Sequence, residues 1–214
     1  TNGIVYPLTR VLYGKRVRQP IGRDFAFSGA LAGFYLTRDA WESDVVRFGI
    51  DIWMTTVAVA EGFKVCQTYL GPWRHAAKGV ESDLGSMFTQ VVSSVYGLMG
   101  EYPLLWQRIM ETQPVPTFGF QYDVGLEPVS VNVDRMIHHF KLAVKDLMEI
   151  WRKILLPETA FWLESIAGLS EHAFSFPRDL WVRIVYDFGI AYHKGQVHRD
   201  HLLRSMVPLY LGWV

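Results

Sequence analysis

Apolar residues that recur every three or four positions are the feature that most constrains the fold of this 214-residue chain. Such spacing places apolar side chains on one face of an α-helix, which then packs against a core. The clearest run follows Asn132 or Ser130, either of which can cap a helix that extends to about Leu156. Its apolar side consists of Met136, Ile137, Phe140, Val144, Leu147, Met148, Trp151, Ile154 and Leu155. We therefore expect a mainly α fold with a few short strands (α+β).

The first half of the chain shows the same spacing in shorter segments. A short helix is expected near Pro7, because proline suits a first helical turn. Thr37 could cap a helix over residues 38–47. Residues 50–60 are apolar with helical spacing and end before Gly62. Residues 63–69 are expected to form a strand.

Prolines mark the boundaries of the later helices. Residues 84–110 predict one long helix or a broken pair, interrupted at Pro103. Pro157 and Pro177 each suit the start of a helix. A last helix is expected over about residues 199–211.

Residues 113–130 change character and predict a boundary between two domains. Prolines and glycines that favour irregular structure gather there: Pro114, Pro116, Gly119, Gly125 and Pro128. We therefore expect one domain over residues 1–112, an irregular linker over 113–130 and a helical C-terminal extension, a bundle, over 131–214.

The charge balance and the single cysteine limit the function classes. The chain carries 21 basic and 21 acidic residues, so it lacks the basic excess that a general nucleic-acid binder needs. Cys66 cannot form a disulfide within the chain, and a buried strand cysteine is the favoured interpretation over a nucleophile. No apolar run approaches the length of a transmembrane helix, and no signal peptide is visible. These observations predict a cytoplasmic protein.

Asp51 is the first candidate for chemistry. It stands in Phe48-Gly49-Ile50-Asp51-Ile52-Trp53, at the start of the helix expected over residues 50–60. The positive end of the helix dipole favours a carboxylate at that position. From spacing alone, a charge that stabilises the helix start is favoured over a site residue.

A second candidate group follows the turn Leu70-Gly71-Pro72. Trp73, Arg74 and His75 stand there, and loops that follow strands often carry functional residues. The imidazole of His75 could bind a divalent metal or a phosphate, although a single loop histidine is more often simply exposed.

Asp24 and the remaining histidines give weaker signals. Asp24 could accept hydrogen bonds from sugar hydroxyls, and an Asx-type turn is at least equally favoured. His198 and His201 are three residues apart and could share a metal, but the favoured interpretation is a pair of surface histidines. The chain contains no Asp-x-Asp, phosphate-binding loop or nucleophile elbow.

The order of several short motifs resembles a known family. The series is Tyr6-Pro7-Leu8, Gln19-Pro20-Ile21-Gly22 followed by Asp24-Phe25, Gly49-Ile50-Asp51-Ile52, Gly62, and Leu70-Gly71 with His75 four residues later. From about Thr1 to Arg108 the chain resembles the acceptor-side half of a family 2-like GT-A glycosyltransferase. The group it resembles most is that of the glucosyl-3-phosphoglycerate and mannosylglycerate synthases.

The resemblance implies roles for individual residues. The acid of the Gly-Ile-Asp-Ile motif would lie beside the sugar and the acceptor, which implies Asp51 as catalytic. The histidine would help to hold a divalent metal, Mg²⁺ or Mn²⁺, on the diphosphate, which implies His75. The Gln-Pro-x-Gly segment would lie near the donor sugar, which implies Gln19 and Asp24. Trp73 replaces a basic residue that contacts a phosphorylated acceptor in the phosphoglycerate enzymes, and Arg74 stands next to it.

The resemblance also implies partners and an incomplete site. The partners would be a nucleotide-diphospho-sugar donor and a hydroxyl acceptor. The chain would be the C-terminal portion of the transferase, with most metal ligands in an N-terminal half that it lacks, and inactive alone. The alternative is a non-catalytic helical interaction or oligomerisation module, with a homodimer formed through the helices after residue 130.

Overall fold

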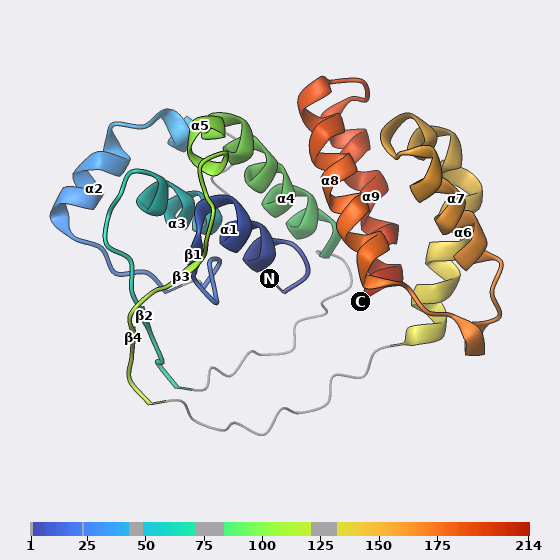
Figure 1. The fold of residues 1–214 in the computed structure, drawn as a ribbon, viewed down its shortest axis with the longest axis horizontal. Coiled ribbons are helices and arrows are strands. Elements are labelled where there is room, and N and C mark those ends of the chain that lie inside the picture. The colour runs from blue at the N-terminus through green and yellow to red at the C-terminus, as the bar shows by residue number, and fades with distance from the viewer. Residues whose placement is uncertain (1, 23, 43–48, 72–83, 121–131) are drawn as a thin grey trace. The chain divides into compact units, whose positions relative to one another are not determined.

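The computed structural model describes residues 2–22, 24–42, 49–71, 84–120 and 132–214, and the chain divides into two compact units (Figure 1). The first unit spans Thr1–Leu126 and the second Glu127–Val214. The described residues are mainly helical, with two small sheets. The expected mainly α fold with short strands is therefore confirmed.

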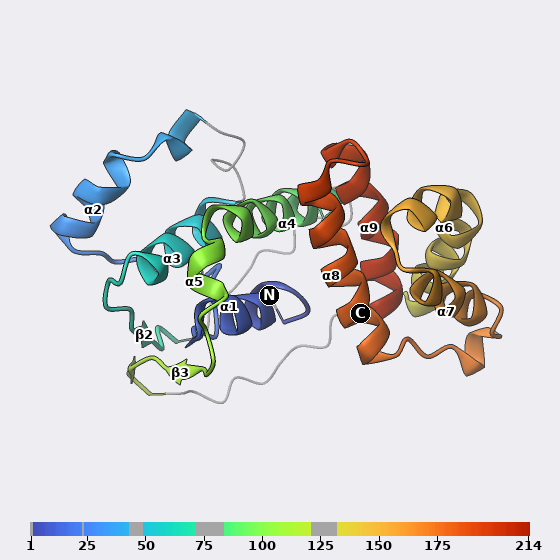
Figure 2. The same cartoon turned by 45° about the horizontal axis from the view of Figure 1, so that its top comes forward.

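Five α-helices among the described residues build the first unit. They are α1 (Val5–Tyr13), α2 (Gly29–Leu36), α3 (Ile50–Ala60), α4 (Leu84–Glu101) and α5 (Pro103–Trp106), with a 3₁₀ turn, η1, at Asp39–Glu42. Helices α3 and α4 pack against each other, and Figure 2 shows both of them above α1. Pro103 begins α5 directly after α4 ends, as the broken-pair alternative expected.

Two parallel ladders join segments of the first unit that are far apart in sequence. Strand β1 (Lys15–Arg16) pairs with β3 (Gln113–Pro114), and β2 (Gln67–Thr68) pairs with β4 (Thr117–Phe118). Each strand is only two residues long. The first part of the segment expected as a linker over residues 113–130 is therefore paired structure within the first unit, because its backbone completes both ladders.

Three local expectations differ from the structure. Thr37 ends α2 instead of beginning a helix over 38–47, and residues 43–47 of that helix lie outside the described residues. The strand expected over residues 63–69 is limited to β2, because its partner β4 offers only two residues for pairing. Cys66 is exposed just before β2, so its interpretation as a buried strand cysteine is wrong.

Four helices build the second unit. They are α6 (Val133–Ile154), α7 (Pro157–Ala167), α8 (Arg178–Lys194) and α9 (Arg199–Trp213), with a 3₁₀ turn, η4, at Glu171–Ala173. The side chain of Asn132 accepts a hydrogen bond from the Arg135 N–H at 2.9 Å, which caps α6 as expected. Helices α8 and α9 lie side by side in Figures 1 and 2.

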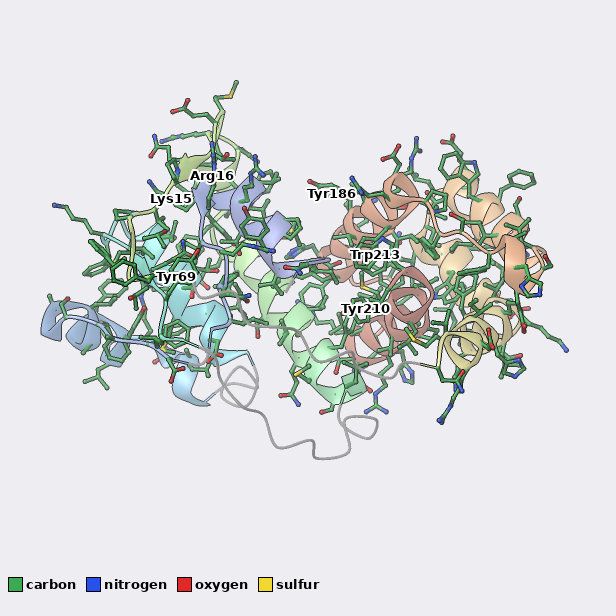
Figure 3. The ribbon with its side chains drawn as sticks, turned by 90° about the horizontal axis from the view of Figure 1, so that it is seen from below. Lys15, Arg16, Tyr69, Tyr186, Tyr210 and Trp213 are labelled. Carbon is green, nitrogen blue, oxygen red and sulfur yellow. The ribbon has the colours of Figure 1, made fainter. Side chains whose placement is uncertain are left out.

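The core of the second unit is rich in aromatic residues. Phe140 and Trp151 of α6 are fully buried, and the Trp151 indole N–H donates to the Ser205 carbonyl of α9 at 3.2 Å. Trp181 of α8 stacks on Trp213 of α9, which Figure 3 labels, with ring centroids 5.2 Å apart. Because the indole bond leaves no polar atom of Trp151 unsatisfied, a large side chain can be buried without a desolvation penalty.

A buried carboxylate links α8 to the start of α7. Asp187 of α8 accepts a hydrogen bond from the Leu156 N–H at 3.1 Å, at the N-terminal end of α7. Burial raises the pKa of this carboxyl, and the bond from Leu156, the Thr159 hydroxyl and the Arg183 charge oppose the rise. Helix α7 has no side-chain cap of its own, and Asp187 of α8 therefore supplies an acceptor for the N–H group at its N-terminal end.

No helix among the described residues combines the length and the apolar character that crossing a bilayer requires.

The close approach of α9 to α6 generates a stability prediction. A Cβ atom at Gly212 would lie 2.7 Å from Cδ2 of the buried Phe140 ring. Gly212→Ala should lower the free energy of unfolding by about 1–3 kcal/mol, because the ring must move within a packed core. Gly97→Ala is the control: Gly97 lies within α4 with no atom in contact range, so alanine should stabilise that helix by up to about 1 kcal/mol. Urea unfolding of both variants measures the two effects, and equal effects would contradict the prediction.

Candidate functional site

Asp51 lies in the first turn of α3, and its side chain is partly exposed. The helix has no side-chain cap at Gly49. A carboxylate in the first turn interacts favourably with the positive end of the helix dipole, by about 0.3–1 kcal/mol. The structure therefore places Asp51 where both sequence interpretations expected it.

The apolar face of α3 fixes the position of Asp51. Trp53 and Val57 are buried in a cluster with Tyr35 of α2 and Leu98 of α4. The Tyr35 hydroxyl donates to the Met54 carbonyl at 2.7 Å, and burial raises the pKa of Tyr35 to about 12. A neutral hydroxyl at physiological pH keeps this donor in place. Helices α2, α3 and α4 thus contribute side chains to one packed cluster.

The Gln19–Gly22 turn is attached to the face of α3 that carries Asp51. The buried Thr55 hydroxyl donates to the Pro20 carbonyl at 2.8 Å. Thr55 stands four residues after Asp51, and residues four apart share one face of a helix. Two motifs separated by about thirty residues in sequence therefore meet on one helix face.

The turn exposes the two polar residues that the sequence singled out. Gln19 and Asp24 are both exposed. The Asp24 N–H donates to the Gly22 carbonyl at 2.7 Å, which closes the turn between them. Both side chains are accessible to a ligand from solvent, beside a turn that is anchored to α3 through Pro20.

Trp73, Arg74 and His75 lie outside the described residues. The described chain reaches Gly71, where β2 has just ended and the Tyr69 N–H donates to the Phe118 carbonyl at 3.0 Å. Gly71 has φ of 89°, a left-handed conformation that glycine adopts without strain, as expected for this turn.

The described residues do not form a metal site by themselves. No group of three or more His, Cys, Asp or Glu residues in the described ranges could hold a metal ion. The rings of His198 and His201 lie 5.7 Å apart without a third ligand among the residues that the structure describes.

Thr55 is the residue that sequence reasoning missed. It stands in an otherwise apolar helix, and a buried hydroxyl normally has a hydrogen-bond partner elsewhere in the fold. That rule could have drawn attention to the pair Thr55 and Thr56. It could not have identified Pro20 as the acceptor, because the partner is distant in sequence.

Comparisons with known proteins gave no match: no family model matches the chain, and neither the curated proteins nor the solved structures include a similar one.

The bond from Thr55 to Pro20 can be tested by replacing neighbouring hydroxyls. Thr55→Val should lower the free energy of unfolding by about 1–3 kcal/mol, because the buried Pro20 carbonyl loses its donor while the side-chain shape is kept. Thr56→Val is the control, because the Thr56 hydroxyl is buried without a hydrogen-bond partner, so its loss should be neutral or stabilising. Chemical denaturation measures both. Equal losses would show that the bond does not hold the turn.

Proposed function

We propose that this chain is the acceptor-side part of a glycosyltransferase that moves a sugar from a nucleotide-diphospho-sugar to a hydroxyl acceptor. The observation that carries the proposal is the attachment of the Gln19–Gly22 turn to the α3 face of Asp51. The two motifs that the resemblance assigns to the sugar are thereby brought to one place, although they are far apart in sequence.

Asp51 would act on the reacting groups by charge or by orientation. Glycosyl transfer develops positive charge at the anomeric carbon, which a nearby carboxylate stabilises. The same carboxylate can orient or deprotonate the acceptor hydroxyl. Asp51 is partly exposed on a helix that is held by a packed cluster of side chains. Its position is therefore set before the ligands bind, which suits both the electrostatic role and the orienting role.

Gln19 and Asp24 would contact hydroxyl groups of the sugar. An exposed amide and an exposed carboxylate together supply both donors and acceptors, which is what sugar hydroxyls require. Trp73 and Arg74 remain candidates for the acceptor side. His75 is this chain's candidate ligand for a divalent metal, whose other ligands would come from outside the described residues.

Replacing Asp51 tests the proposal in the complete protein, with the donor-binding half present. Asp51→Asn keeps the shape and removes the charge, so turnover of a nucleotide-sugar panel should fall by about 10²–10⁴-fold. Asp134→Asn is the control, because Asp134 is also a first-turn acid, in α6 of the second unit. Product formation is measured by mass spectrometry, with thermal unfolding as a check on folding. Near-normal turnover of Asp51→Asn would overturn the assignment of Asp51.

We infer as a second candidate that the helical unit forms a homodimer through α8. Val182, Tyr186 and Ile190 of α8 are 45%, 41% and 53% exposed and follow one another at helical spacing; Figure 3 labels Tyr186. Asp179 and His193 are exposed on the same face, at opposite ends of the stripe. In an antiparallel pair centred on Tyr186, each Asp179 carboxylate would face the His193 imidazole of the second copy, so a hydrogen-bond acceptor would meet a possible donor at each end.

Sedimentation velocity tests the dimer. Ile190→Glu should raise the dissociation constant at least about tenfold, because it buries a charge within the contact. Phe161→Glu makes the same kind of change at an apolar residue of α7 that is 66% exposed and lies off the stripe, so it should leave the dimer unchanged. A strictly monomeric, folded wild-type chain would exclude this candidate.

A further inference from the structure

Three arginines at the edge of the first unit have no carboxylate partner among the residues that the structure describes. Arg10 comes from α1, Arg16 from β1 and Arg18 from the residues that follow β1. All three are exposed, and we call them the arginine face. The ion pairs seen among the described residues involve other arginines: Arg38, Arg152, Arg183 and Arg204.

Neutral acceptors hold the arginine face in place. The Nε atoms of Arg10 and Arg16 both donate to the Thr112 hydroxyl, at 3.4 and 3.2 Å, and Nη2 of Arg16 donates to the Thr112 carbonyl at 3.0 Å. Two guanidinium groups therefore meet at one hydroxyl oxygen. Two positive charges repel each other at such a distance. A bound anion between the two guanidinium groups would therefore stabilise the arrangement by offsetting that repulsion.

Arg18 extends the same face along α1. Its guanidinium lies over the Tyr6 ring at 4.9 Å and donates to Oδ1 of Asn2 at 2.7 Å. Tyr6 and Arg10 stand four residues apart on one face of α1. Arg16 and Arg18 are exposed on either side of the buried Val17, as alternation along an extended segment requires.

The Lys15 side chain lies on the other side of β1 from Arg16, so its charge is not part of the arginine face. Its Nζ donates to Oε1 of Gln113 at 2.9 Å, and the Gln113 amide donates to Glu111 at 3.3 Å. The carboxylate of Glu111 therefore accepts a hydrogen bond from the Gln113 amide on the side of β1 that carries Lys15. Lys15 and Arg16 are both labelled in Figure 3.

We propose that the arginine face binds a phosphate-bearing ligand. Each guanidinium has five N–H donors, and most of them on these three residues have no protein acceptor among the described residues. Planar guanidinium forks match phosphate oxygens in pairs, which a lysine does not. The chain has no net charge, so attraction of anions to this face is a local property and not one of the whole protein. The proposal does not depend on sugar transfer.

Two probes distinguish a soluble phosphate from a lipid headgroup. Calorimetry with inorganic pyrophosphate, at low and at physiological ionic strength, tests the first source. Flotation with vesicles of phosphatidylcholine, with or without phosphatidylglycerol, tests the second. Binding of either probe that weakens with salt supports the proposal and identifies the source. Binding of neither probe at low ionic strength would overturn it.

A pair of matched variants in the 214-residue chain tests the site itself. Arg16→Gln should weaken binding of the effective probe at least about tenfold, because one fork of charge-assisted bonds is lost. Lys15→Gln removes the same charge from the adjacent residue on the other side of β1, and should weaken binding less than about threefold. If Arg16→Gln proves unfolded by circular dichroism, Arg10→Gln replaces it, since Arg10 makes only the single 3.4 Å bond. Equal losses from the arginine and lysine variants would show a diffuse charge effect and overturn the site.

Discussion

The packing of Trp53 and Val57 between Tyr35 and Leu98 is the interaction on which the candidate site depends. It fixes helix α3 between α2 and α4, and α3 carries both Asp51 and the hydroxyl that holds the Gln19–Gly22 turn. Full burial of each large apolar side chain contributes roughly 1.5–3 kcal/mol. The position of a partly exposed carboxylate is thus determined by side chains on the opposite face of its helix.

The long helices could be predicted because their apolar residues are spaced for one buried face. In the 22-residue helix α6 the apolar pattern agrees with the Asn132 cap, and in α7 it agrees with a proline in the first turn. Helix α2 could not be predicted in the same way, because Gly29–Leu36 is apolar on all sides and carries two glycines. The one strand expected from the sequence, over residues 63–69, was too long for another reason: only Gln67 and Thr68 pair with β4, and the local sequence does not encode a partner that is distant in the chain.

The candidate site shows the same division between local and distant information. Asp51 at the start of a helix could be predicted from the residues around it. The position of Asp51 relative to Gln19 and Asp24 could not be derived from spacing. It depends on the hydrogen bond between Thr55 and Pro20, which lie on either side of α2 in the sequence. The arginine face likewise depends on Thr112, which only the fold brings to Arg10 and Arg16.

The pairing of β1 with β3 has a consequence for synthesis of the chain. Lys15 and Gln113 are 98 residues apart, so the first unit closes only after a long interval of translation. At roughly 5–20 residues per second, that interval is on the order of 5–20 s. During it, the apolar side of α1, with Leu8 and Leu12, lacks part of its native cover, and β1 has an open edge that other chains could pair with. The edge of β1 therefore stays without its partner until residues 113 and 114 have left the ribosome.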